Sequence, residues 1–288
     1  MISFQRDHFV NTADLVFPYS DDISGTLRGY RVFTACRTVN GKIFRLDDHL
    51  DRLYKSASII YMQPPRSRQE LRELLLDVVE RNRLENPADL LIDIIFSGGL
   101  QAETMKQSGN GAHLYIAVQR MVAPPKECYD KGVGLATFTH QRMLPDVKLL
   151  NYIGAVIAHQ TVVPKYDAYD TLFLCPRDNN TILEGSTFTV FFVAKGGEIV
   201  TPPLDGRILD SVTRRAIFEI IRPRTDMKII EKTVTLDRID DFDEAFLAST
   251  TRNILPVVRL DDKLIGSGKP GPVSRKAMAL LNEFVGSY

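Results

Sequence analysis

The spacing of apolar residues changes along the chain and predicts a mixture of strands and helices. Arg31 to Val39 alternates and is rich in β-formers, and Asn40-Gly41 then predicts a hairpin turn. From Leu50 to Ala57 the apolar residues recur at the spacing of a helix, which Asp47 is expected to cap. The chain therefore switches from strand to helix periodicity within its first sixty or so residues.

A second helix is predicted by Ser67 and Glu70, which have the spacing of a capping box and precede leucines at helical intervals. Ala88 to Phe96 and His113 to Val118 are apolar runs of strand length and are expected to be buried strands. The first part of the chain is therefore predicted to be an α/β unit.

Two consecutive prolines, Pro124 and Pro125, mark a change of organisation, because this proline content is typical of a linker. We expect an N-terminal α/β domain at residues 1–121, a linker at 122–130 and a C-terminal domain at 131–288. Further strands are expected at Gly134 to His140, Thr171 to Leu174, Phe188 to Val193 and Glu244 to Ser249. Further helices are expected at Asn151 to Val162, Thr213 to Ile221 and Ser274 to Phe284.

The composition is that of a globular protein that works on small molecules. With 288 residues, of which 44% are hydrophobic, the chain can bury a large core. Its 36 basic residues balance 36 acidic ones, so no net charge draws it to nucleic acid. The N-terminus lacks an apolar signal segment, and no apolar run reaches the roughly 18 residues of a membrane span, so a cytoplasmic location is expected.

The metal-ligating residue types are scattered. Cys36, Cys128 and Cys175 are odd in number and lack CxxC spacing, which argues against a disulfide framework and against a zinc site. The 5 histidines have no ligand-like spacing either. We expect no metal.

Lys148 and Glu184 are the residues that suggest chemistry. A lysine amine can form a Schiff base with a carbonyl and later move protons, and a carboxylate can hold a bound pyridine ring protonated. This pairing suggests pyridoxal phosphate. Taken alone, Lys148 is more typical of a solvated surface and Glu184 of an ordinary hairpin.

The segments around these two residues, with others in the same order, resemble the class IV aminotransferases, which are fold type IV pyridoxal phosphate enzymes. The matching segments are Leu46 to Ala57, Pro145 to Tyr152, Leu183 to Thr187, Leu209 to Arg214, Ala248 to Thr251 and Pro256 to Val273. The resemblance covers the chain from about Phe33 to the C-terminus and is strongest to D-amino-acid transaminases. It implies a smaller N-terminal α/β domain, a larger C-terminal pseudo-barrel domain that binds the cofactor, and a homodimer.

The resemblance also implies a role for each matching residue. Lys148 would be the Schiff-base lysine and the base that moves a proton between substrate and cofactor, and Glu184 would hold the ring nitrogen protonated. Arg52 would bind the phosphate and Tyr152 would lie near the 3′-oxygen of the cofactor. The remaining cofactor residues would be Leu209 under the ring, and Val212, Thr213, Thr250 and Thr251 at the phosphate. Without the resemblance, each threonine would be read as a helix cap or a turn hydroxyl.

Two departures from the family pattern concern the substrate. Gly29 to Thr34 places Arg31 where the family has a glycine and Thr34 where it has a glutamate, and Phe33 lies in the same stretch. The segment 97–103 lacks the Arg-x-His pair that holds the substrate carboxylate in the familiar D-amino-acid enzymes. Our hypothesis is that Arg31, helped by Arg28, binds that carboxylate, because a buried carboxylate needs a compensating charge. The alternative is that Arg31 pairs with an acidic neighbour.

The favoured function is ping-pong transamination from a D-amino acid such as D-alanine or D-glutamate to a 2-oxo acid. A branched-chain L-amino-acid transaminase, an (R)-primary-amine transaminase and an aminodeoxychorismate lyase remain open. A catalytically silent pyridoxal phosphate-binding protein is the alternative outside enzymes. The presence of both Lys148 and Glu184 argues against it, because binding alone needs no proton shuttle.

Overall fold

The computed structural model describes residues 1–83, 88–99 and 111–288, which form two compact units. Unit 1 comprises residues 1–122, 147–151 and Tyr288, and unit 2 comprises residues 123–146 and 152–287. This division differs from the predicted domains in one respect, because the short segment around Lys148 groups with the N-terminal unit. In addition, the predicted linker 122–130 contains most of a helix, Lys126–Lys131, whose N-cap position is Pro125.

Unit 1 is built on a six-stranded sheet with the order β2-β1-β6-β5-β3-β4. Its strands are β1 Ile2–Gln5, β2 His8–Asn11, β3 Arg31–Val39, β4 Lys42–Ile43, β5 Leu90–Ser97 and β6 His113–Arg120. Its helices are α1 Ile23–Arg28, α2 Leu46–Ile59 and α3 Arg68–Arg83, with 3-10 turns at Thr12–Asp14 and Tyr19–Asp21.

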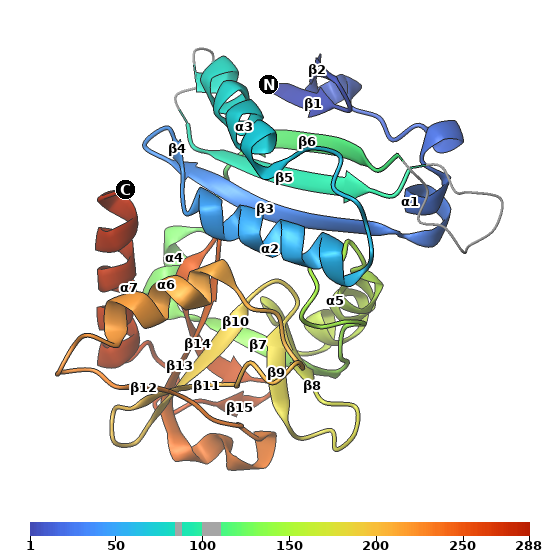
Figure 1. Cartoon of the computed structure of the whole chain (residues 1–288). Coiled ribbons are helices and arrows are strands. Elements are labelled where there is room, and N and C mark those ends of the chain that lie inside the picture. The colour runs from blue at the N-terminus through green and yellow to red at the C-terminus, as the bar shows by residue number, and fades with distance from the viewer. Residues whose placement is uncertain (84–87, 100–110) are drawn as a thin grey trace. The chain divides into compact units, whose positions relative to one another are not determined.

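The core of unit 1 forms where α2 and α3 cover one face of this sheet (Figure 1). Every second residue of β5, from Leu90 to Phe96, points into this core, because successive side chains of a strand face opposite sides. The helices contribute leucines at helical spacing, such as Leu50, Leu53 and Leu71, each with no exposed area. The α/β unit expected from the sequence is therefore present.

Unit 2 is built on a nine-stranded mixed sheet with the order β12-β11-β10-β13-β14-β7-β8-β9, in which β15 pairs with β14. Its strands are β7 Val133–Thr139, β8 Asp170–Leu174, β9 Ile182–Gly185, β10 Thr189–Ala194, β11 Ile199–Thr201, β12 Ile229–Glu231, β13 Phe242–Ser249, β14 Asn253–Leu260 and β15 Lys263–Leu264. Its helices are α4 Lys126–Lys131, α5 Ile153–Lys165, α6 Val212–Ile221 and α7 Pro272–Gly286, with a 3-10 helix at Leu236–Asp241.

The sheet of unit 2 curves into a half-barrel around its own core. Side chains from strands far apart in the sheet, such as Leu172 of β8 and Phe192 of β10, belong to one buried cluster. On β10 and β13 the alternate residues Phe191 and Phe246 stack on each other with ring centroids 4.9 Å apart. The half-barrel is the pseudo-barrel domain that the sequence led us to expect. Among the described residues, no helix is both long enough and apolar enough to span a membrane.

The start of α2 differs from the prediction. The helix begins at Leu46, and its N-cap position is Arg45 in the left-handed region, with φ 52° and ψ 44°. Asp47, expected as the cap, lies instead in the first turn, where it accepts hydrogen bonds from Arg68 and Arg72. A carboxylate in the first turn still favours the helix by its interaction with the helix dipole. The capping box is confirmed, since Ser67 and Glu70 exchange hydrogen bonds at the start of α3.

Candidate active site

Lys148 is fixed through its backbone within unit 1. Its N–H donates to Ser56 Oγ on α2 at 3.1 Å, and its carbonyl accepts from the Phe33 N–H on β3 at 3.0 Å. The next residue, Leu149, forms an antiparallel bridge with Val32. A loop residue is thereby held as firmly as a strand residue, which suits a side chain that must be placed accurately.

The Lys148 side chain is 9% exposed. Its ammonium lies 4.7 Å from the centroid of the Phe33 ring, close enough for a cation–π contact. Phe33, which the sequence assigns to the substrate side, is thus a direct neighbour of the candidate catalytic amine.

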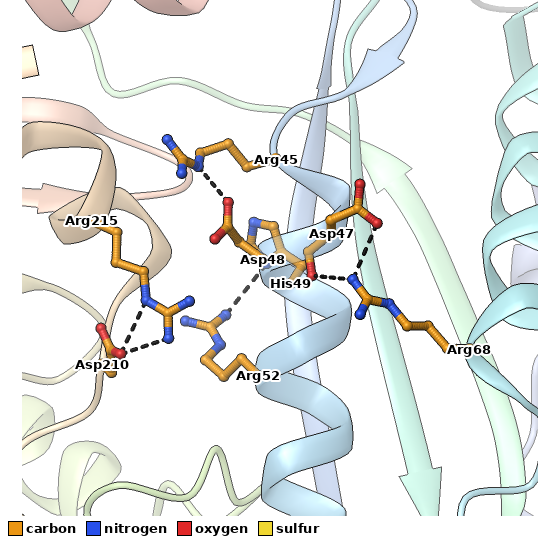
Figure 2. Close-up of polar contacts among 8 residues, drawn as sticks. All are labelled: Arg45, Asp47, Asp48, His49, Arg52, Arg68, Asp210 and Arg215. Carbon is orange, nitrogen blue, oxygen red and sulfur yellow. Dashed lines mark hydrogen bonds and ion pairs between the residues drawn. The ribbon is translucent and has the colours of Figure 1, made fainter. Parts of the chain in front are cut away.

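Arg52 is buried on α2 and is held from β3 and from its own helix. Its Nη2 donates to Thr34 Oγ1 at 2.9 Å and lies 3.4 Å from His49 Nδ1 (Figure 2). Thr34 Oγ1 is also 2.9 Å from His49 Nδ1. Because a guanidinium only donates, its contact with His49 requires an unprotonated Nδ1. The threonine that stands in place of the family glutamate therefore positions the candidate phosphate arginine.

Arg31 lies at the start of β3 and forms an ion pair with a buried aspartate. Its Nη2 is 2.6 Å from Asp22 Oδ2, and its Nε donates to Ser97 Oγ at 2.8 Å. The Asp22 side chain has no exposed area, and the guanidinium also lies 4.5 Å from the ring centroid of Phe17. These contacts match the alternative in which Arg31 pairs with an acidic neighbour. Arg28 is the exposed last residue of α1, and residues 100–103 of the segment without the Arg-x-His pair lie outside the described residues.

Glu184 lies on β9 in unit 2 and is held by a cation that the sequence analysis missed. Arg142 donates to Glu184 Oε1 from Nε at 3.0 Å and also from Nη2. The Leu209 N–H lies 3.3 Å from each carboxylate oxygen. Next to Glu184, Gly185 leaves room for Phe188, because a Cβ at this glycine would lie 2.1 Å from the ring. The carboxylate is thus buried, paired and fixed in position.

The charges at Glu184 shift neighbouring pKa values. Burial alone would lower the pKa of the Arg142 guanidinium, but the attraction and hydrogen bonds of Glu184 outweigh burial and raise it. Burial, helped by the charge of Arg142, lowers the pKa of His140. Arg142 has a sequence signal in hindsight, because a buried carboxylate implies a cation close by.

The other candidate cofactor residues of unit 2 lie at element ends. Val212 and Thr213 are buried in the first turn of α6, where Ser211 caps the helix by accepting from the Arg214 N–H at 3.3 Å. Figure 2 shows Arg215 of this helix paired with Asp210, at 2.6 Å between Nη2 and Oδ2. Thr250 and Thr251 form the half-buried turn between β13 and β14, and Tyr152 is the N-cap residue of α5. Helix starts and turns of this kind present N–H and hydroxyl donors that suit an anion.

Residues 31–260 match the model of the amino-transferase class IV family, so the chain belongs to this family. D-alanine aminotransferase of Bacillus licheniformis is 30% identical over 90% of this chain and 90% of its own length. The branched-chain-amino-acid aminotransferase of Pseudomonas aeruginosa is 30% identical over 81% of this chain and 76% of its own length. The crystal structure of a thermophile branched-chain amino acid aminotransferase (source given as T.th.) with pyridoxamine 5'-phosphate superposes with a TM-score of 0.87 at 26% identity, covering 99% of this chain and 94% of that one. The fold expected from the resemblance is confirmed.

Proposed function

We propose that this aminotransferase moves an amino group from a D-amino acid to a 2-oxo acid in a ping-pong reaction, with pyridoxal phosphate as cofactor. The observation that carries the proposal is a buried lysine fixed through its backbone, Lys148, in a chain of the class IV family. The preference for D-amino acids rests on the D-alanine aminotransferase relative, which matches over more of the chain than the branched-chain relative.

The residues present fit this cofactor in each unit taken by itself. Unit 1 offers a buried cation, Arg52, which suits a phosphate, and the buried amine of Lys148. Unit 2 offers the buried carboxylate of Glu184, and the first turn of α6 at Thr213. When bound, pyridoxal phosphate supplies an aldehyde and a ring that accepts electron density from the substrate.

Each of these residues has a proposed task. Lys148 holds the cofactor covalently and, once released from it, takes and returns the proton of the substrate. Glu184 keeps the ring nitrogen protonated, and Tyr152 lies near the 3′-oxygen. Leu209 packs under the ring, and Arg52 binds the phosphate together with Val212, Thr213, Thr250 and Thr251. Arg31 braces the start of β3 through Asp22, and Phe33 lines the substrate side.

The covalent part of the proposal has a direct test. Purified protein supplied with pyridoxal phosphate is reduced with borohydride, digested and mapped by mass spectrometry. We expect the label on Lys148, and a Lys148→Ala variant that takes no label is the control. A label on another lysine would refute the assignment.

The substrate is tested by following cofactor absorbance with single amino donors. D-alanine should convert the bound cofactor faster than L-leucine, and 2-oxoglutarate should reverse the change. Faster conversion by L-leucine would favour the branched-chain alternative, the class to which the superposed structural neighbour belongs. (R)-1-phenylethylamine, and pyruvate release from aminodeoxychorismate, test the remaining enzyme alternatives. A bound cofactor that responds to no donor would favour the silent binding protein.

We further propose a homodimer in the cytoplasm. The outward residues of α5 include Ile153, Val156 and Ile157, which are 63%, 53% and 47% exposed. Such an apolar face is typical of a surface covered by a second copy. Cys36, Cys128 and Cys175 are free thiols, which fits a reducing compartment. Light scattering of wild type and an Ile157→Asp variant tests the dimer, since the charge should shift the mass toward the monomer.

A further inference from the structure

Asp170, the first residue of β8, is a buried carboxylate on which several segments of unit 2 converge. Its side chain is 2% exposed. Oδ1 accepts from His159 Nε2 at 2.9 Å, from Ser186 Oγ at 2.6 Å and from the Thr171 N–H at 2.7 Å. Oδ2 accepts from Arg252 Nη2 at 2.9 Å. Asp170 therefore joins α5, the residue that follows Gly185, and the turn after β13.

Arg252 uses every nitrogen of its guanidinium. Besides the bond to Asp170, Nη1 donates to Thr187 Oγ1 at 2.8 Å and Nε donates to Tyr169 Oη at 3.2 Å. Its carbonyl oxygen accepts from Tyr129 Oη at 3.0 Å. The side chain is 17% exposed. A planar guanidinium held at all its nitrogens fixes the backbone that carries it, which a lysine ammonium cannot do in the same way.

The residues tied together in this way directly follow the proposed cofactor residues. Ser186 and Thr187 come two and three positions after Glu184, and Arg252 follows Thr250 and Thr251. The Arg252 N–H also donates to the Ser249 carbonyl at 3.4 Å, which closes the turn. The network thus links the segment of the proposed ring-nitrogen partner to the turn that is proposed to hold the phosphate.

We propose that Arg252, anchored by Asp170 and Thr187, is a positioning residue that holds the Thr250–Thr251 turn ready for the cofactor phosphate. This inference rests on the proposed function, because the phosphate role of that turn is part of it. The physical reason is preorganisation: a turn that is already ordered loses less conformational entropy when the phosphate binds. Arg252 acts on the turn's geometry, so its effect should depend on the phosphate group of the ligand.

The test compares two aldehydes that differ only in that group, pyridoxal phosphate and pyridoxal. Dissociation constants of both are measured on apoprotein of wild type, Arg252→Lys and Thr187→Val. Arg252→Lys keeps a cation beside buried Asp170 but loses the fork. Thr187→Val removes one acceptor from an exposed side chain and serves if the lysine variant folds poorly. Arg238→Lys is the matched control, because Arg238 pairs with Asp241 and is 69% exposed.

We expect Arg252→Lys to weaken pyridoxal phosphate binding by about tenfold or more, a scale on which partners of direct ligands act. Pyridoxal affinity should stay within about twofold, and Thr187→Val should show a smaller loss of the same kind. Equal weakening of both aldehydes, or no weakening, would overturn the inference while the proposed function stands. Wild-type protein that binds pyridoxal phosphate no more tightly than pyridoxal would overturn the phosphate assignment itself, and this inference with it.

Discussion

Arg142 and Glu184 form a buried ion pair in which both Nε and Nη2 of the arginine donate to the same carboxylate oxygen. The side chains are 11% and 8% exposed. An arginine in this position keeps the carboxylate ionised, and an ionised carboxylate is what a protonated ring nitrogen requires. Glu184→Gln should therefore lower kcat by about 100-fold or more, as losses of preorganised charge do. The bound cofactor should remain, as measured by its absorbance, and normal turnover of this variant would contradict the role.

The same pair makes a prediction about stability. Arg142→Met leaves the Glu184 carboxylate buried without its cation, which should cost about 3 kcal/mol of unfolding free energy. Adding Glu184→Gln removes the uncompensated charge, so the double variant should recover part of that loss. Urea denaturation of the wild type, both single variants and the double variant measures this. If the double variant is no more stable than Arg142→Met, the pair does not account for the loss.

His140 reports the charge of Arg142 from the other side. Its pKa is lowered first by burial and then by the nearby guanidinium, below the ordinary value of 6.5. The unfolded chain therefore takes up this proton at a higher pH, so the contribution of His140 to stability is complete above about pH 6.5 and falls as the pH drops below it. In Arg142→Met, an NMR titration of the His140 ring should give a higher pKa than in wild type. An unchanged pKa would assign the whole shift to burial.

Much of the fold could be predicted because it follows from local patterns. β3 runs from Arg31 to Val39, as the alternation predicts, and the turn at Asn40 and Gly41 joins it to β4. The capping box at Ser67 starts α3 at the next residue. These features depend on residues close in sequence, where spacing and turn chemistry are sufficient.

The features that were missed depend on residues far apart in sequence. β14 contains Pro256 and has no clear period, and it is a strand because it pairs with both β13 and β7. Arg142 and Glu184 are 42 positions apart, and Arg252 and Asp170 are 82 positions apart. No local pattern announces such pairs. The resemblance to a family supplied Lys148, Glu184 and Arg52, but not the residues that hold them.

Asp178, in the loop before β9, gives a stability prediction that depends on pH. Hydrogen bonds from the Thr181 hydroxyl and N–H, and from the Asn180 N–H, lower its pKa to about 2. A carboxyl with a lowered pKa stabilises the folded state above its unfolded pKa, and this contribution is lost as the pH falls from about 4 toward 2. Thr181→Val should thus lower the Tm at pH 7, and the difference from wild type should shrink across this acid window. A difference that is the same at every pH would assign the effect to packing.

The last prediction separates the two roles considered for Arg31. Arg31→Met leaves buried Asp22 without its cation and should cost about 3 kcal/mol of stability. Asp22→Asn in the same chain should restore part of it, because no unpaired charge then remains. If Arg31 is a brace, the Michaelis constants for amino and 2-oxo acids stay within about twofold of wild type in the double variant. If Arg31 binds the substrate carboxylate, those constants rise by about tenfold or more in both variants, because neutralising Asp22 cannot replace a lost carboxylate partner.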